Sequence, residues 1–140
     1  MSVQIESLTK TYGSQNAVDS ISFSAGPGQI LGFLGPNGAG KSTTMKIITC
    51  FIPQTSGKAS VCGFDVVENP MEVRRNIGYL PEHNPLYLDM YVKEALCFMA
   101  DIHQIQNKQK RITEVIELTG LGEEQYKKIG ALSKGYRQRV

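Results

Sequence analysis

Apolar residues in the first third of the chain recur at strand spacing and then at helix spacing. Residues 3–8 alternate apolar with polar positions, and residues 17–24 carry apolar residues between turn-forming ones. A turn cluster at 25–28 leads into Ile30–Leu34, a nearly continuous apolar run that is typical of a strand buried on both faces. From residue 41 to about 51 the apolar positions follow a helical period. A strand, a loop and a helix in this order predict an α/β fold.

Short elements alternate in the middle of the chain, and two longer helices follow. The pattern predicts a strand over 57–63, a helix entered at a proline over 70–76, and a short strand over 77–80. Helical spacing of apolar residues returns over 91–106 and over 108–119.

Two signals mark the ends of elements in the last part of the chain. Gly120 stands where the second long helix should stop. Residues 132–140 have the pattern of a helix that is only beginning. No internal repeat, low-complexity tract or linker divides the sequence, so residues 1–140 are expected to belong to one domain.

Composition and charge exclude several classes of protein. Apolar residues make up 41% and charged residues 20% of the 140 positions, as in globular domains. The 15 basic and 13 acidic residues nearly balance, which leaves a net charge of only +2. A nucleic-acid-binding face normally needs a larger excess of positive charge, so no nucleic-acid partner is expected. The apolar runs are too short to cross a bilayer, and the N-terminus does not resemble a signal peptide. Cys50, Cys62 and Cys97 form no C-x-x-C pair, which favours mostly buried free thiols in a soluble cytosolic domain.

The strongest functional pattern is a complete phosphate-binding loop of the form G-x-x-x-x-G-K-S/T. Glycines allow several backbone N–H groups to point at a phosphate, and the helix that follows adds the positive end of its dipole. Lys41 can reach the β- and γ-phosphates, and the Ser42 hydroxyl can bind Mg²⁺. The predicted nucleotide-binding residues are Gly35, Pro36, Asn37, Gly38, Ala39, Gly40, Lys41, Ser42 and Thr43.

The loop alone does not choose between a GTPase, a kinase, a helicase and a transporter ATPase. A guanine site usually carries Asn-Lys-x-Asp, but the nearest string, at 107–110, has no carboxylate to hold the base. GTP specificity is therefore disfavoured.

Four motifs in order resemble the nucleotide-binding subunits of ABC (ATP-binding cassette) transporters, from about Val3 to Val140. Tyr12 matches the aromatic residue that stacks on adenine in that family, and residues 35–43 match its phosphate loop. Residues 77–82 match the segment that ends in the Q-loop residue, which is Glu82 here instead of glutamine. Residues 132–136 match the signature motif L-S-G-G-Q.

The signature departs from the family pattern at two positions. Lys134 and Tyr136 replace the usual glycine and glutamine. Such variants resemble the subgroup that serves ABC-2-type exporters, including gliding-motility-associated systems. The resemblance implies a P-loop NTPase fold with a mixed sheet, an antiparallel β subdomain, and a helical subdomain over about 77–135. Residues 132–140 would start the signature helix.

The resemblance also implies roles for individual side chains. Tyr12 would stack on the adenine of ATP, and Ser42 and Glu82 would hold Mg²⁺. Ser133 and Gly135 would reach the γ-phosphate held by a second ATPase subunit in a head-to-tail dimer. Each role has a structural alternative: Tyr12 could pack a strand end, Glu82 could be a solvated loop carboxylate, and Ser133 with Gly135 could only cap a helix.

The chain shows no catalytic carboxylate site of the kind a P-loop ATPase needs. The best candidate is Asp65, but polar and glycine residues interrupt the run before it and no glutamate follows. Asp65 instead matches the V-x-G-x-D segment of the family. The Walker B pair and the switch histidine are missing, so we expect an N-terminal fragment without hydrolysis of its own. Its sheet would then have an apolar edge that favours aggregation.

The remaining charged residues suggest no second site. His83 and His103 have no metal-ligand partner at useful spacing. A basic cluster near the end of the chain is expected to be a solvated face rather than a nucleic-acid patch: Lys127, Lys128, Lys134, Arg137 and Arg139.

The function predicted for the complete subunit is ATP hydrolysis that drives an ABC-2-type exporter. An integral membrane subunit would contact the chain around Pro70–Leu88, on the inner face of the cell membrane. Two alternatives remain: a soluble ABC protein that acts on ribosomes or DNA, and an ATP-binding fragment that does not hydrolyse. Only two short helices lie between Glu82 and Leu132, which favours transport over the long insertions of soluble members.

Overall fold

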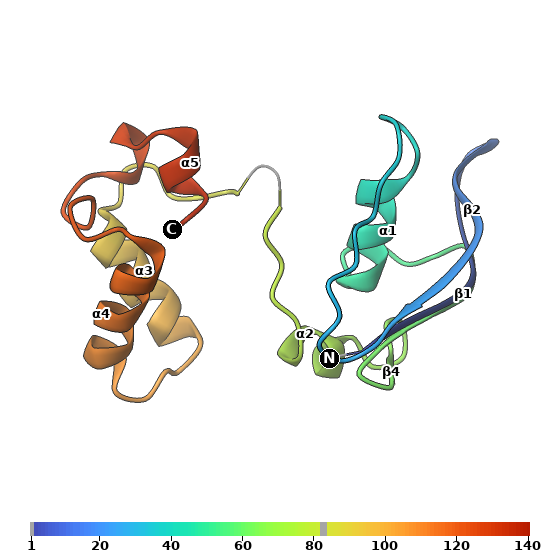
Figure 1. Ribbon diagram of the computed structural model, residues 1–140, viewed down its shortest axis with the longest axis horizontal. Coiled ribbons are helices and arrows are strands. Elements are labelled where there is room, and N and C mark those ends of the chain that lie inside the picture. Colours follow the sequence, from blue (N-terminus) through green and yellow to red (C-terminus); the bar gives the residue numbers. More distant parts are fainter. Residues whose placement is uncertain (1, 82–83) are drawn as a thin grey trace. The chain divides into compact units, whose positions relative to one another are not determined.

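The computed structural model describes residues 2–81 and 84–140 and divides the chain into two units, Met1–Tyr79 and Leu80–Val140 (Figure 1). The first unit contains β1 (Val3–Tyr12), β2 (Gln15–Ala25), α1 (Lys41–Ile48), β3 (Ser56–Val61), β4 (Phe64–Asp65) and α2 (Pro70–Arg75). The second contains α3 (Val92–Ile102), α4 (Lys108–Thr119), the 3₁₀ helix η1 (Ile129–Ala131) and α5 (Lys134–Arg137). In the described parts of the chain, no helix is both long and apolar enough to span a bilayer.

The sheet of the first unit is antiparallel, in the order β2-β1-β3-β4. Val3 of β1 pairs with Ala25 of β2 on one side and with Val61 of β3 on the other. The pairing of β1 with β2 is irregular after Ile5. There the backbone N–H of Ser7 donates to the Ser22 hydroxyl at 2.8 Å instead of to a strand carbonyl. The predicted strands over 3–8, 17–24 and 57–63 are confirmed.

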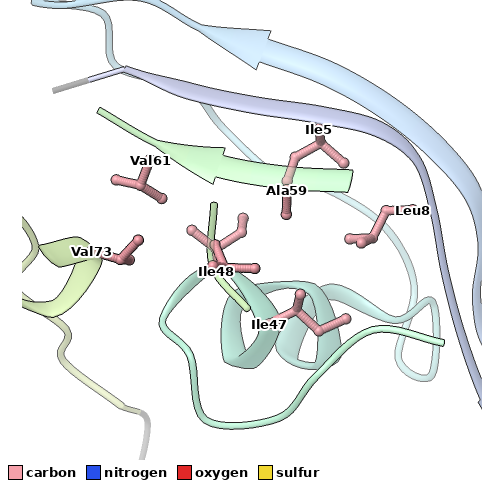
Figure 2. Packing of buried hydrophobic residues seen from close by; sticks show 8 residues of the cluster. Ile5, Leu8, Ile47, Ile48, Ala59, Val61 and Val73 are labelled. Atoms are coloured by element: carbon pink, nitrogen blue, oxygen red, sulfur yellow. The ribbon is translucent and has the colours of Figure 1, made fainter. Parts of the chain in front are cut away.

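One face of this sheet is covered by α1, and the shared core lies between them (Figure 2). Leu8 and Ile47 are fully buried at 0% exposure, which stabilises the fold by ~1.5–3 kcal/mol for each side chain. Short helix α2 adds one apolar side chain to the same core. The buried members of this cluster are Ile5, Leu8, Ile47, Ile48, Ala59, Val61, Val66 and Val73.

The second unit is built on the helix pair α3 and α4, joined by residues 103–107. Their apolar faces pack together with residues from the segment that follows, as the buried Ile116, Leu121 and Ile129 show. Gly120 ends α4 as predicted. Its N–H donates to the Glu117 carbonyl at 3.1 Å, and the Leu121 N–H donates to the Ile116 carbonyl at 2.9 Å, which is the Schellman arrangement.

Two strand predictions are wrong. Ile30–Leu34 and residues 77–80 have no strand structure, and the sheet of the described residues includes neither segment. Ile30 is 103% exposed and Leu34 is 93% exposed, although an apolar run of this kind normally lies inside a sheet. An extended segment becomes a strand only when a neighbouring strand supplies its hydrogen bonds, and apolar spacing does not tell whether one is present.

This exposed run predicts that the 140-residue chain associates with itself. An extended apolar segment with unpaired backbone groups is a template for pairing with another copy. Leu34→Lys is therefore expected to shift the chain toward monomer in size-exclusion chromatography with light scattering. Leu118→Lys is the matched control, because Leu118 is 79% exposed but lies in α4, where the backbone is already hydrogen-bonded. An equal effect of both changes would contradict the pairing explanation.

Candidate nucleotide-binding site

The predicted phosphate loop lies directly before α1 in the first unit. A turn closes inside it, where the Ala39 N–H donates to the Pro36 carbonyl at 3.2 Å. Gly38 and Gly40 have φ of 86° and 80°, in the left-handed region that side chains other than glycine disfavour. The loop therefore takes a conformation that depends on its glycines.

Gly40 also has a steric requirement, because β2 passes close to it. A Cβ atom at this position would lie 2.2 Å from the Ala17 carbonyl oxygen and 3.1 Å from Val18 Cγ2. A Cβ atom cannot lie 2.2 Å from a carbonyl oxygen, so only glycine fits at this position without a shift of the backbone. The contact fixes the end of the loop, and hence the start of α1, against the edge of β2.

The start of α1 presents positive charge. Among the described residues no side chain caps the helix at Gly40, so its first backbone N–H groups remain for another acceptor. Lys41 folds back over the loop, and its Nζ donates to the carbonyl oxygens of Gly35 and Pro36, both at 2.6 Å. The helix dipole and this ammonium together favour an anion at the loop.

The three residues after Lys41 differ in their surroundings. Ser42 is exposed and Thr43 is half-buried. Thr44 is buried, and its hydroxyl donates to the Gly40 carbonyl at 3.0 Å. Thr44 therefore supports the helix start, whereas the Ser42 side chain is open to a ligand or a metal ion.

Tyr12 lies at the end of β1, near the point where β2 contacts Gly40 of the phosphate loop. It pairs with Gln15 of β2, two residues before the Ala17 carbonyl that touches Gly40. Two residues of a strand span ~7 Å, so the aromatic ring and the end of the phosphate loop lie along the same stretch of β2. The Tyr12 side chain is 53% exposed, which leaves ring surface available for a planar ligand.

The structure describes only one of the two predicted Mg²⁺ ligands. Glu82 and His83 lie outside the described residues, and the other histidine, His103, is exposed. In the ranges 2–81 and 84–140 no three His, Cys, Asp or Glu side chains group as a metal site. Ser42 with phosphate oxygens still fits Mg²⁺, because this ion keeps several waters and usually takes only one or two protein ligands beside a nucleotide.

Asp65 has a structural role. Its carboxylate Oδ1 accepts the backbone N–H of Val67 at 2.7 Å and that of Glu68 at 3.1 Å. These bonds form the turn between β4 and α2. Asp65 therefore fits the structural assignment made from the sequence and not a catalytic one.

The three cysteines form no disulfide with one another. Cys50, Cys62 and Cys97 are free and half-buried, so they are less buried than the composition suggested. Burial raises the pKa of the Cys50 thiol, with a smaller opposing effect from Arg74. The thiol form is therefore favoured over the thiolate at neutral pH.

The signature segment lies in the second unit, at the start of α5. Ser133 caps this helix, since its Oγ accepts the Tyr136 N–H at 3.3 Å. Gly135 is exposed in the first turn. Ser133 therefore caps the helix, as the structural alternative expected. The exposed side of the turn at Gly135 is still accessible to a ligand.

The basic cluster is not a uniformly solvated face, so that prediction is wrong for part of it. Arg137 is half-buried, and its guanidinium donates to the carbonyl oxygens of Ile129 at 3.2 Å and Gly130 at 2.7 Å. Arg139 lies over the Tyr136 ring at 4.9 Å. Lys127 pairs with Glu124 at 2.8 Å, and that hydrogen bond raises the Lys127 pKa. No local pattern in the sequence distinguishes Arg137 from its neighbours, because its partners belong to η1.

Arg137→Ala is expected to loosen the signature segment. A four-residue helix has little stability of its own, and the change leaves two carbonyl groups without their charged donor. We expect a loss of ~1–3 kcal/mol in the stability of this segment, read as faster hydrogen exchange over 129–137. Lys134→Ala, an exposed change in the same helix, should leave exchange unchanged. Equal exchange in both variants would show that the Arg137 bonds carry no stability.

A glycine loop in the left-handed conformation, a lysine folded over it and an uncapped helix behind it define a P-loop phosphate site. Residues 18–140 match the family model described as ABC transporter. The chain therefore belongs to the ABC transporter family.

Its relatives include ATP-binding proteins of bacteria. The bacitracin transport ATP-binding protein BcrA of Bacillus licheniformis is 38% identical over 99% of this chain and 45% of its own length. The linearmycin resistance ATP-binding protein LnrL of Bacillus subtilis is 36% identical, also over 99% of this chain and 45% of its own length. The chain thus spans less than half the length of these relatives.

Solved structures confirm the predicted fold class. The structure of an ATP-binding subunit of an ABC transporter matches with a TM-score of 0.85 and 26% identity, over 99% of this chain and 59% of that one. A dimeric ATP-binding cassette bound to ADP and Pi also matches with a TM-score of 0.85, at 23% identity, over 98% of this chain and 66% of that one. The second likeness concerns the fold alone.

Proposed function

We propose that this chain binds MgATP through residues 35–43, and that the complete protein hydrolyses ATP to drive an ABC-2-type exporter. The observation that carries the proposal is the conformation of the loop: left-handed glycines, with the Lys41 ammonium 2.6 Å from two loop carbonyls. The left-handed glycines let the loop backbone take a conformation in which its N–H groups can surround a phosphate. Gly40 is required by the approach of β2, whereas the space around Gly38 is open to a ligand.

Each residue has a defined task in this proposal. Lys41 exchanges the carbonyl oxygens of Gly35 and Pro36 for phosphate oxygens, and the first N–H groups of α1 bind the same phosphates. Ser42 supplies a hydroxyl to Mg²⁺, which neutralises phosphate charge when it is bound. Tyr12 stacks on the adenine, a contact worth ~1 kcal/mol.

The catalytic step belongs to the complete protein. Residues 1–140 contain no apolar run that ends in the Asp-Glu pair whose glutamate would polarise the attacking water. We place Ser133 and Gly135 at the nucleotide of a second ATPase subunit in a head-to-tail dimer, with the signature turn held by its own cap. A membrane subunit would bind around Pro70–Leu88, which positions the protein on the inner face of the membrane.

Export is favoured by the relatives and by the signature. The two Bacillus proteins are named for bacitracin transport and linearmycin resistance. Lys134 and Tyr136 are the departures that suggested the ABC-2-type subgroup. Association with gliding motility stays a prediction, as nothing in the comparisons bears on it.

Affinity purification of the complete protein from detergent-solubilised membranes tests the assignment to transport. An integral membrane subunit should co-purify, and adding ATP should change the stability of that complex. Recovery with ribosomes or DNA instead would favour the soluble alternative. The 140-residue chain alone should bind MgATP without turnover, and steady hydrolysis by it would contradict our view that the catalytic carboxylate lies elsewhere.

A further inference from the structure

Lys10 stands beside Tyr12 on β1, and its side chain is held from two directions. Its Nζ donates to the Pro53 carbonyl at 2.8 Å. The same nitrogen lies 5.2 Å from the centroid of the Tyr12 ring, within the range of a cation–π contact. One ammonium therefore connects the aromatic ring to a loop more than forty residues away in sequence.

The Pro53 carbonyl is itself a fixed anchor. The Thr55 N–H donates to the Thr9 carbonyl at 2.9 Å, and the Thr11 N–H donates to the Thr55 hydroxyl at 3.0 Å. These bonds hold Thr55, two residues after Pro53, to β1 on both sides of Lys10. A lysine side chain is normally mobile, but this one is restrained by a rigid acceptor.

We propose that Lys10 is a positioning residue for Tyr12 and, through that ring, for the adenine of ATP. The inference rests on the proposed function, because it requires Tyr12 to stack on the base. The ammonium occupies one face of the ring, restricts its rotation and leaves the remaining exposed surface to the ligand. It also withdraws electron density from the ring, which strengthens stacking with an electron-rich purine.

The test compares two ligands that share the triphosphate and differ by the adenosine group, whose base Tyr12 would contact. MgATP carries the base, whereas magnesium tripolyphosphate carries the phosphates alone. In calorimetric titrations of the complete protein, Lys10→Met should weaken MgATP binding by about three- to tenfold, the scale of one cation–π or stacking contact. Tripolyphosphate affinity should be unchanged. Lys10→Arg keeps the cation and should retain most of the ATP affinity.

A double-mutant cycle shows whether Lys10 acts through the ring. In a Tyr12→Ala background, Lys10→Met should have no further effect on ATP binding. Lys58→Met is the matched control: Lys58 is exposed on the neighbouring strand β3 and should affect neither ligand.

Three results would overturn the proposal. An equal loss for ATP and tripolyphosphate would show that Lys10 acts on charge or folding. A persistent loss in the Tyr12→Ala background would show direct contact with the nucleotide, and unchanged ATP affinity would show no role. If the unsubstituted protein binds neither ligand, the proposed function itself fails and this inference falls with it.

Discussion

Lys41→Ala is expected to lower MgATP affinity by at least a hundredfold. The Lys41 ammonium is the one side-chain cation placed on the phosphate loop by the described structure, 2.6 Å from the carbonyl oxygens of Gly35 and Pro36. Charged hydrogen bonds contribute ~1.5–3 kcal/mol each, and two to the phosphates correspond to about two to four decades in affinity. Calorimetric titration of the complete protein with MgATP measures the change.

Lys46→Ala provides the matched control for this experiment. Lys46 lies in the same helix α1 but is exposed in its last turn, away from the loop. Its removal should leave ATP affinity within about twofold, as for most exposed charges. Lys41→Ala also breaks two internal bonds, so thermal unfolding of both variants should be recorded. Parental ATP affinity in a folded Lys41→Ala protein would refute the proposed phosphate site.

Gly40→Ala is expected to cause a large loss of stability, although it adds only one methyl group. The new Cβ would stand 2.2 Å from the Ala17 carbonyl, at a φ of 80° that alanine disfavours. The left-handed backbone alone costs ~1–2 kcal/mol, and relief of the clash must move the loop away from β2. We expect the free energy of unfolding to fall by more than ~2 kcal/mol and ATP binding to be lost, because the loop and α1 no longer hold their positions.

Gly38→Ala separates the steric effect from the backbone effect. Gly38 has a similar φ of 86°, but a Cβ there meets nothing within 4 Å. Gly38→Ala should therefore lower the free energy of unfolding only by the ~1–2 kcal/mol of the left-handed backbone. Urea unfolding of both variants, with the slope of the transition as a check on two-state behaviour, gives the comparison. Equal losses of unfolding free energy in the two variants would mean that the close contact between β2 and Gly40 does not add to the destabilisation.

Local features of this protein could be predicted because their causes lie within a few residues. The Gly120 stop of α4 and the Ser133 cap of α5 depend on bonds between positions three to five apart. The phosphate loop is similar, since its glycines, lysine and helix are contiguous. The hairpin of β1 and β2 follows from two alternating segments around a short turn.

The expected strand at Ile30–Leu34 shows where such reasoning ends. Its apolar side chains suit the centre of a sheet, yet whether it pairs depends on a second strand that local spacing does not reveal. In the structure the segment stays outside the β2-β1-β3-β4 sheet, and its Ile30, Leu31 and Leu34 side chains are exposed.

By itself, the sequence of this protein determined the chemistry of the phosphate loop and the identity of most helices, because both depend on neighbours in the chain. Only the tertiary structure decided that Gly40 abuts Ala17, that Lys10 joins Tyr12 to Pro53, and that Arg137 binds the carbonyls of η1. Most of these contacts join residues far apart in sequence. Their formation depends on how sheet and helices pack, which single positions do not encode.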